Sequence, residues 1–279
     1  MTRVAFTEAT FNMKNKQKYS RLRAIIKGLQ SVVVAFSGGV DSTLLLKVCL
    51  DVLGRGNVVA FIGLSPTCPE KEIAEARKLA ALIGVELVAA ETAEMDDPRF
   101  IENNTSRCYF CKTHLFAKAR EIAVQRGFSH VVEGSNVDDM DDFRPGRKAC
   151  SEQGVKSPLL QAGLTKEEIR ELSEALSLPT HDKPSFACLS SRVPYGTAID
   201  ETILKRIERA EDFIQSIGIR QVRVRYHGNI ARIEVLDKDF DAVMAHRDKI
   251  TEAFKHYGFL YVVLDLKGYR TGSMNIPSE

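Results

Sequence analysis

The chain has 279 residues, of which 39 are Lys or Arg and 37 are Asp or Glu, so its formal net charge is +2. With 44% hydrophobic and 27% charged residues, its composition is that of a globular protein. This excludes a disordered chain, a collagen-like repeat and a polyelectrolyte that binds through net charge alone. The length suits one large domain or a large domain with a smaller companion.

The longest apolar runs, such as Val32–Phe36 and Val58–Leu64, fall far short of the roughly 20 residues that span a bilayer. Charged residues interrupt the first thirty positions, so we see no secretion signal. The six cysteines are too sparse for a disulfide scaffold, and we expect reduced thiols that serve catalysis or metal binding. We therefore expect a cytoplasmic protein that makes no membrane contact.

The first fifteen residues show little periodicity, and we expect them to be loosely held. An amphipathic helix with a basic face follows to residue 29, and a nucleic-acid-binding arm is the alternative. From residue 31, strand and helix patterns alternate. Strands are predicted at 31–36, 57–64, 85–91 and 130–134, and helices at 40–53, 69–83, 107–126 and 166–176. This alternation predicts an α/β fold with a doubly wound, mostly parallel sheet.

The pattern changes near residue 184, because residues 183–197 are rich in Pro, Ser and Gly and lack periodicity. We interpret this segment as a loop between two domains. A helix at 202–217, a hairpin from 221–226 and 231–235, a helix at 240–257 and a strand at 260–266 are predicted beyond it. The sequence thus predicts a domain of residues 1–185 and a small α+β domain of residues 186–279.

The most informative motif is SGGVDS at residues 37–42, which follows a predicted strand and opens a helix. Gly38 and Gly39 let backbone N–H groups turn inward, and the helix N-terminus adds partial positive charge. The hydroxyls of Ser37 and Ser42 are further donors. The motif therefore predicts an anion-binding loop, with an ordinary glycine-rich turn as the alternative. It lacks the Lys of the GxxxxGK[ST] loop.

This motif resembles the pyrophosphate loop of the ATP pyrophosphatase, or PP-loop, superfamily, which includes NAD and GMP synthetases, tRNA thiolases and sulfur transferases. The resemblance implies that ATP is split between its α and β phosphates, that the loop holds pyrophosphate and that AMP passes to an acceptor. Asp41 would then help to bind Mg²⁺, which prefers carboxylate and phosphate oxygens.

A second polar cluster, EGSNVDD at residues 133–139, ends a predicted strand at the sheet edge where open α/β folds bind ligands. Gly134 and Asn136 suit close approach to a nucleotide, and Asp138 or Asp139 is a candidate metal ligand. A solvated turn is the alternative interpretation of this acidic segment.

Cys108 and Cys111 form a CxxC pair at the start of a predicted helix, which places both sulfurs on one face and favours thiolates. Alone, the pair is ambiguous between a redox pair, half a zinc site, cluster ligands and chance spacing. His114, Cys150 and Cys188 are candidates to complete a zinc site. Cys188 lies in the loop between the domains, where ligand clefts form, and a buried structural cysteine is the alternative.

Further segments narrow the resemblance to the LarE-type ATP-dependent sulfur transferases, over about residues 20–275. They are LPTHDKPSFACLSSRVPYGT, RPGRKA, KSPLLQAGLTKEEIR, VRVRYHGNIARIEV and GYRTGSMN. The resemblance implies an enzyme that adenylates a carboxylate of pyridinium-3,5-biscarboxylic acid mononucleotide and converts it to a thiocarboxylate. The product leads to the nickel-pincer nucleotide cofactor of lactate racemase. The sulfur-bearing cysteine of the family lies in the ACLxSR motif, which places it at Cys188.

The family contains two patterns of sulfur delivery. In sacrificial members the counterpart of Cys188 gives up its own sulfur and becomes dehydroalanine. A subgroup instead holds a 4Fe–4S cluster through a CxxC pair and the motif cysteine, leaving the fourth iron to carry a hydrosulfide. Cys108, Cys111 and Cys188 fit this pattern, and we expect the cluster route over the sacrificial one. The resemblance also implies a homo-oligomer and a sulfide or other sulfur-donor system.

Arg223 and Arg225 stand two apart on a predicted strand, so they share a face and are candidates for a fork that binds the mononucleotide phosphate. The resemblance supports this and adds Glu211, Glu234 and Asp241 as candidates for a Mg²⁺ or phosphate site. Ordinary surface charge is the alternative for all five residues.

Three other functions fit parts of the pattern. A tRNA thiolase would need an extended basic surface, which a net charge of +2 disfavours. An ammonia-dependent amidotransferase of the NAD-synthetase kind shares the adenylation but needs no sulfur site. A non-enzymatic nucleotide sensor would release no pyrophosphate. We expect a small nucleotide substrate and no nucleic-acid partner.

Overall fold

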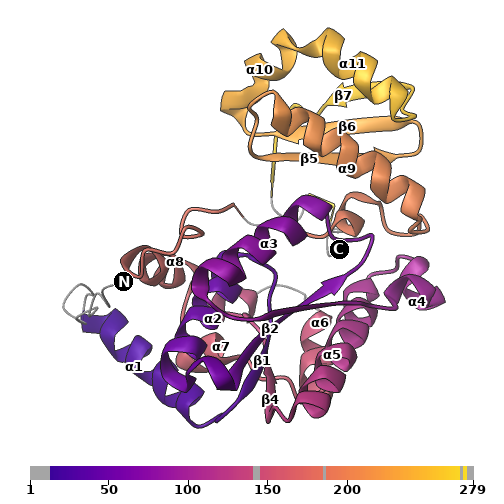
Figure 1. The fold of residues 1–279 in the computed structure, drawn as a ribbon. Helices are drawn as coiled ribbons and strands as arrows, with labels where there is room; N and C mark the ends of the chain where they lie inside the picture. Colours follow the sequence, from indigo (N-terminus) through magenta and orange to yellow (C-terminus); the bar gives the residue numbers. More distant parts are fainter. Residues whose placement is uncertain (1–12, 141–144, 185–186, 271–272, 275–279) are drawn as a thin grey trace. The chain divides into compact units, whose positions relative to one another are not determined.

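The structure is a computed structural model that describes residues 13–140, 145–184, 187–270 and 273–274 (Figure 1). Most of the N-terminal stretch that we expect to be loosely held lies outside these ranges, as do Arg144 of RPGRKA and residues 271, 272 and 275 of GYRTGSMN. Two compact units divide the chain. The first contains 1–65, 70–97 and 106–186, and the second contains 66–69, 98–105 and 187–279. The two short segments in the second unit have no counterpart in our contiguous division at residue 185, which stays a prediction.

A parallel sheet forms the centre of the first unit, in the strand order β3-β2-β1-β4. Val32 of β1 pairs with Val58 of β2 on one side and with His130 of β4 on the other. The strands are β1 (Val32–Ala35), β2 (Val58–Leu64), β3 (Leu87–Glu91) and β4 (His130–Val132). The predicted α/β fold with a mostly parallel sheet is therefore confirmed.

Both faces of this sheet are covered, because successive strand residues point to opposite sides. Val32 and Val34 pack into a core shared with α1 (Met13–Lys27), α2 (Val40–Leu53), α3 (Glu70–Ile83) and α8 (Lys166–Ala175). Val33, between them, packs into a separate core with α5 (Arg107–Arg126), which Figure 1 shows on the other side of the sheet. Burial on both faces explains the uninterrupted β-branched run in β1.

The connection after β1 and the connection after β4 lie at the same edge of the sheet, because the two strands are parallel neighbours. The first connection carries the SGGVDS motif into α2. The second carries EGSNVDD through the short helix η4 (Val137–Met140). The fold therefore places both polar motifs together.

The second unit contains a three-stranded sheet in the order β5-β6-β7. β5 (Val222–His227) and β6 (Ile230–Val235) form the predicted antiparallel hairpin, while β7 (Tyr261–Leu264) pairs with β6 in parallel. The hairpin turns through Gly228, whose φ of 64° favours glycine. Inward-facing residues of the sheet share a core with α9 (Glu201–Ser216) and α11 (Arg247–His256).

The prediction of one continuous helix at 240–257 is wrong, because the structure divides this segment into α10 (Phe240–Ala245) and α11. At His246 the backbone φ is −104° and ψ is 10°, outside helical values. The His246 ring nitrogen Nδ1 contacts the Ala242 carbonyl oxygen at 2.9 Å, and its amide N–H is shared between the carbonyls of Ala242 and Val243. This tight closing turn ends α10.

Three short helices were not predicted, namely α4 (Pro98–Ile101), α6 (Gly146–Glu152) and α7 (Pro158–Ala162). Each has seven residues or fewer, too short for a helical period to show in the sequence. In the described ranges, no helix combines the length and apolar character needed to cross a membrane.

Candidate functional site

The SGGVDS loop has a backbone that only glycine fits comfortably. Gly38 has a φ of 70°, and a Cβ added there would lie 3.3 Å from the Cα and the Cβ of Ala76 on α3. The residue before the loop is still fixed to the sheet, because the Phe36 N–H donates to the Phe61 carbonyl oxygen at 2.8 Å. The glycine in the motif therefore reflects both conformation and close packing.

The serine hydroxyls hold the loop closed on itself. Ser37 Oγ lies 3.2 Å from Ser42 Oγ and accepts from the Gly39 N–H at 3.3 Å. Gly39 is the N-cap of α2, and no side chain caps this helix. The uncapped N–H groups and the positive end of the α2 dipole fit a phosphate, so the residues present suit the pyrophosphate of ATP.

The second polar motif contacts the first directly. Asn136, buried with 2% of its surface exposed, donates from Nδ2 to Asp41 Oδ1 at 3.1 Å. A Cβ on Gly134 would stand 3.1 Å from the backbone nitrogen of Ser42 and 3.2 Å from the Asp41 Cβ. Gly134 thus allows the chain after β4 to pack on the start of α2, and the structure brings Asp41, Gly134 and Asn136 together.

Lys166 is a member of this group that we did not predict. Its ammonium group forms an ion pair with Asp41 Oδ2, and its backbone N–H donates to Asp138 Oδ2. Asp138 and Asp139 are themselves joined to Asn136, since the Asp138 N–H donates to Asn136 Oδ1 and the Asn136 N–H donates to Asp139 Oδ2, each at 3.0 Å. The only sequence signal for Lys166 is its place in KSPLLQAGLTKEEIR.

Lys183 is a second unpredicted cation beside the loop. Its Nζ lies 2.8 Å from Glu72, 2.9 Å from Glu75 and 3.4 Å from the Gly38 carbonyl oxygen. Burial opposes its charge, but the hydrogen bonds and charges of Glu72 and Glu75 outweigh burial and raise its pKa. Lys183, at the start of the 183–197 segment, therefore links that segment to the SGGVDS loop.

The CxxC pair occupies the first turn of α5, as predicted, with Cys108 and Cys111 both half-buried. The two other candidates in the first unit have separate environments. His114 Nε2 contacts Asp97 Oδ2 at 2.9 Å. Cys150 lies in the core, where burial and the charge of Glu133 raise its pKa to about 11. Over the described ranges, no three His, Cys, Asp or Glu side chains are grouped closely enough to hold a metal ion.

Cys188 belongs to the second unit, where Arg192 holds its backbone. Arg192 is fully buried, and its Nη1 donates to the Cys188 carbonyl oxygen at 2.9 Å and to the Ala187 carbonyl oxygen at 2.5 Å. Its Nε and Nη2 donate to the two carboxylate oxygens of Glu211, each at 2.9 Å. This paired contact fixes the Cys188 segment to α9. We missed the role of Arg192, although it closes the ACLxSR motif.

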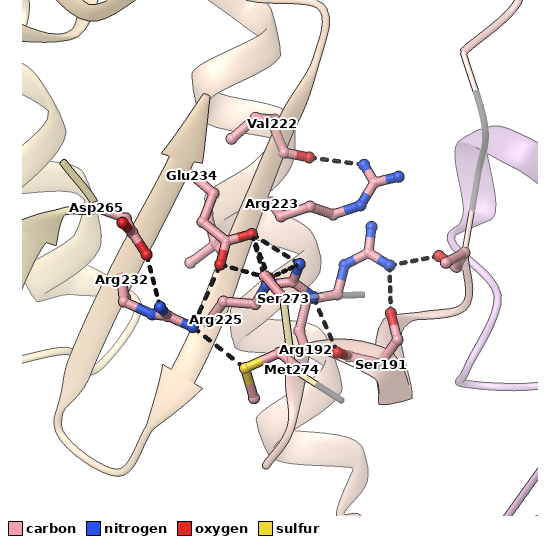
Figure 2. Close-up of polar contacts among 12 residues, drawn as sticks. Ser191, Arg192, Val222, Arg223, Arg225, Arg232, Glu234, Asp265, Ser273 and Met274 are labelled. Atoms are coloured by element: carbon pink, nitrogen blue, oxygen red, sulfur yellow. Dashed lines mark hydrogen bonds and ion pairs between the residues drawn. The ribbon is translucent and has the colours of Figure 1, made fainter. Parts of the chain in front are cut away.

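A cluster of buried charges lies beside this segment on the outer face of the hairpin (Figure 2). Arg225 donates to Glu234 from Nε at 3.0 Å and from Nη2 at 2.7 Å. It also donates from Nη1 to the Ser191 carbonyl oxygen at 3.0 Å and from Nη2 to the Ser273 hydroxyl at 2.9 Å. Arg232 completes the group by pairing with Glu234 and Asp265. Strands β5 and β6, the segment that contains Ser191, and Ser273 near the C-terminus therefore meet at Arg225 and Glu234.

Arg223 lies in the same cluster but has a different environment. Its Nη1 donates to the Val222 carbonyl oxygen at 2.7 Å, and its guanidinium group lies over the Tyr269 ring. Burial lowers its pKa, and repulsion by Arg192 adds to the effect. A bound anion would offset this repulsion.

The three predicted acids have different surroundings. Glu211 accepts from Arg192 and from the Val224 N–H, and Glu234 accepts from Arg225 and Ser273. Asp241 is exposed in the first turn of α10, and among the described residues no hydrogen bond or ion pair joins it to the cluster. The structure therefore brings Glu211 and Glu234 to the arginines but leaves Asp241 outside.

Comparisons with known proteins find relatives that match nearly the whole chain. An uncharacterized protein of Synechocystis is 40% identical over 262 residues, which are 93% of this chain and 97% of that protein. The pyridinium-3,5-bisthiocarboxylic acid mononucleotide synthase of Lactiplantibacillus plantarum is 37% identical over 258 residues, 92% of this chain and 94% of the synthase. The chain belongs to the family of this synthase. We refer to it below as a LarE-type protein.

Part of the chain also resembles NAD synthases. The family model of NAD synthase matches residues 14–126, and the NH(3)-dependent NAD(+) synthetase of Methanopyrus kandleri is 38% identical over 68 residues, 24% of each chain. The NAD synthase family model ends before Cys188. The predictions of a LarE-type protein, of a PP-loop fold and of an ATP-dependent enzyme are thus confirmed. The three-cysteine subgroup, Mg²⁺ and the roles of individual residues stay predictions.

Proposed function

We propose that this LarE-type protein uses ATP to convert a carboxylate of pyridinium-3,5-biscarboxylic acid mononucleotide into a thiocarboxylate. The single observation that carries the proposal is its similarity, over 92% of its length, to a protein named as the corresponding bisthiocarboxylic acid synthase. The uncapped start of α2 and the ACLSSR segment support it, since they supply a phosphate site and a cysteine.

The first chemical step is an adenylation. A carboxylate resists nucleophiles because its oxygen is a poor leaving group. When a carboxylate oxygen attacks the α-phosphorus of ATP, pyrophosphate leaves and the acyl group gains AMP as a good leaving group. The N–H groups of the Gly38–Ser42 loop and the Lys166 ammonium stabilise the departing negative charge. Asp41 and Asp138 are the carboxylates that would hold Mg²⁺ near the phosphates.

The second step delivers sulfur through Cys188. Its thiolate attacks the acyl-adenylate carbon, AMP departs and a thioester forms. In the sacrificial route a base then removes the Cys188 α-proton, the Cβ–S bond breaks and the thiocarboxylate leaves with the sulfur. Dehydroalanine remains in the chain. Arg192 acts as a positioning residue, because it fixes the Cys188 carbonyl and hence the cysteine backbone.

We also propose a cluster route in which Cys108, Cys111 and Cys188 together bind a 4Fe–4S cluster. Three thiolates are the soft ligands that iron prefers, and such a cluster would supply a sulfide for the transfer. The described side chains form no metal-binding group, so this part of the proposal depends on the donor types alone. It needs a sulfide or other sulfur-donor system, whereas the sacrificial route does not.

The buried cluster of the second unit is our candidate for the mononucleotide phosphate. Burial and repulsion by Arg192 lower the pKa of Arg223, so a bound anion beside Arg223 would relieve this repulsion. Glu211 and Glu234 then act by positioning arginines, with Mg²⁺ binding as the alternative role. We further propose a homo-oligomer that acts in the cytoplasm, takes this small nucleotide rather than nucleic acid, and serves lactate racemase maturation.

Mass spectrometry during turnover tests the function. With ATP, Mg²⁺ and the biscarboxylic acid mononucleotide, we expect AMP, pyrophosphate and thiocarboxylate from the native protein. Cys188→Ala should form no thiocarboxylate, while the matched control Cys150→Ala should retain it. Thiocarboxylate formation by Cys188→Ala would contradict the assigned sulfur path.

Anaerobic purification decides between the two routes. The cluster route predicts bound iron and sulfide that are lost in Cys108→Ala, with Cys188 intact after turnover. The sacrificial route predicts a colourless protein that forms at most one thiocarboxylate per chain, with Cys188 lighter by one H₂S afterwards. Pyrophosphate release that depends on ammonium rather than on a sulfur source would overturn both routes and favour an amidotransferase.

A further inference from the structure

A second cysteine lies beside Cys188 in the folded chain, although 120 positions separate them in the sequence. The Leu189 N–H donates to the Thr67 carbonyl oxygen at 2.8 Å. The hydrogen-bonded peptide groups are those between Thr67 and Cys68 and between Cys188 and Leu189. Residues 66–69 and 187–279 belong to the same compact unit, so this contact lies within one unit.

This hydrogen bond limits how far apart the α-carbons of the two cysteines can lie. The α-carbon of Cys68 is fixed next to the accepting oxygen, and the α-carbon of Cys188 is fixed next to the donating nitrogen. With standard bond lengths and angles, the two α-carbons stand roughly 4–7 Å apart, which is the range in which disulfides form.

The surroundings of these two cysteines differ from those of Cys49 and Cys150. Cys68 and Cys188 are both half-buried, whereas Cys49 and Cys150 are buried in apolar cores. Cys68 Sγ lies 3.9 Å from the Pro69 carbonyl oxygen, and a thiol is a weak hydrogen-bond donor. Solvent access and proximity are the two requirements for thiol–disulfide exchange.

We propose that Cys68 and Cys188 form a reversible disulfide that switches the sulfur site off. The oxidant is a low-molecular-weight disulfide such as glutathione disulfide. The thiolate of Cys188 attacks one of its sulfurs, forms a mixed disulfide and releases one glutathione thiolate. The thiolate of Cys68 then attacks Cys188 Sγ, the Cys68–Cys188 bond forms and the second glutathione leaves. A dithiol reductant reverses both steps.

The regulatory consequence rests on the proposed function, in which Cys188 bears the sulfur. A disulfide-bonded Cys188 has no thiolate to attack an acyl-adenylate and none to donate to iron. Adenylation would continue, because the SGGVDS loop contains no cysteine. The disulfide itself does not depend on the substrate, so its formation can be measured separately.

The test is a redox titration of the full-length protein in glutathione buffers without added iron, followed by alkylation of remaining thiols and tryptic mass mapping. Trypsin gives peptide 56–71, whose only cysteine is Cys68, and peptide 171–192, whose only cysteine is Cys188. We expect these peptides to be cross-linked within one chain under oxidising conditions and separate after reduction. In Cys68→Ser, glutathione adducts at Cys188 should increase about tenfold, because no neighbouring thiol resolves them.

Cys150→Ser is the matched control, and its cross-link should be unchanged. Absence of the 56–71 to 171–192 cross-link at every glutathione ratio, with equal Cys188 adducts in the native protein and Cys68→Ser, would overturn the proposal. A cross-link that forms while the protein makes no thiocarboxylate under reducing conditions would preserve the disulfide and refute the proposed function instead. A cross-link that leaves thiocarboxylate formation unaffected would refute the switch.

Discussion

The two polar sites of this protein use different chemical groups. In the first unit, the SGGVDS loop combines glycines, small hydroxyls and an N-terminus of α2 without a side-chain cap, and its Asp41 contacts Asn136 and Lys166. In the second unit, the site beside Cys188 is built from long side chains, with Arg192 paired to Glu211 and Arg225 paired to Glu234. The first site depends on backbone shape, and the second depends on charge pairing.

This difference determines what each site tolerates. A backbone site is damaged by adding a Cβ atom where none fits, even when charge is unchanged. A buried ion-pair site is damaged by removing one partner, because the remaining charge loses its compensation in a dry environment. Three substitutions and one labelling experiment test whether the two sites respond in these different ways.

Arg192→Met should have the largest effect on stability. It leaves the carboxylate of Glu211 buried without its bidentate partner, and we expect a loss of about 3–5 kcal/mol in the free energy of unfolding. Urea titration measures the loss. The exposed Arg209→Met is the matched control on α9 and should change little. The double variant Arg192→Met/Glu211→Leu should recover part of the loss, and no recovery would contradict the charge explanation.

Gly38→Ala should have the second largest effect. The methyl group forces an L-residue into a φ of 70° and places its Cβ 3.3 Å from the Ala76 Cα, so we expect a cost of about 1–3 kcal/mol together with loss of AMP formation. Gly56→Ala is the control, since a Cβ there has nothing within 4 Å and Gly56 has no positive φ. If both variants kept full AMP formation, the loop would not be the phosphate site.

Lys166→Met should separate function from stability. Its ion pair with Asp41 is partly exposed, so we expect a stability cost of only about 0.2–1 kcal/mol. Lys47 forms a comparably exposed pair with Asp51 on the same helix that begins at the loop, and Lys47→Met should cost a similar amount. AMP formation should fall about tenfold only in Lys166→Met, as expected for a charge that stabilises pyrophosphate. Equal activities would remove Lys166 from the site.

Cysteine labelling gives the smallest perturbation. Because burial raises the pKa of Cys150 to about 11, only about one in a thousand of its thiols is ionised at pH 8. Cys150 should therefore resist iodoacetamide in the native protein, and its rate should rise about tenfold between pH 8 and pH 9. Guanidinium-unfolded protein, in which all six cysteines are accessible, is the control. Equal rates for Cys150 in the native and unfolded protein would contradict its burial.

The sequence was sufficient to predict the parallel sheet, the hairpin and the bounds of α2 and α5. Each depends on local patterns: β-branched runs, a helix ending at a glycine, and a polar-apolar alternation. The SGGVDS site was predictable for the same reason, because its binding groups are contiguous. Lys166 and Arg192 were not assigned roles, since a lysine or arginine in a helix or loop carries no local mark of its partner 125 or 19 positions away.

Partner choice among long side chains is a tertiary property. Arg223 and Arg225 were predicted to share a face because strand periodicity requires it, and their register opposite Glu234 and Arg232 agrees. Periodicity could not show that Glu234 binds Arg225 or that Glu211 binds Arg192. The break at His246 was missed for a related reason, because a single histidine closing a helix leaves the apolar spacing of the flanking turns nearly unchanged.

In the proposed reaction, ATP activates a carboxylate of the mononucleotide by adenylation before sulfur arrives. Turnover of substrate labelled with ¹⁸O in its carboxylates tests this directly, with mass spectrometry of the nucleotide and phosphate products. Adenylation should place one ¹⁸O atom in AMP for each thiocarboxylate formed and none in pyrophosphate. Label in inorganic phosphate with ADP as the nucleotide product, or AMP without label, would contradict it.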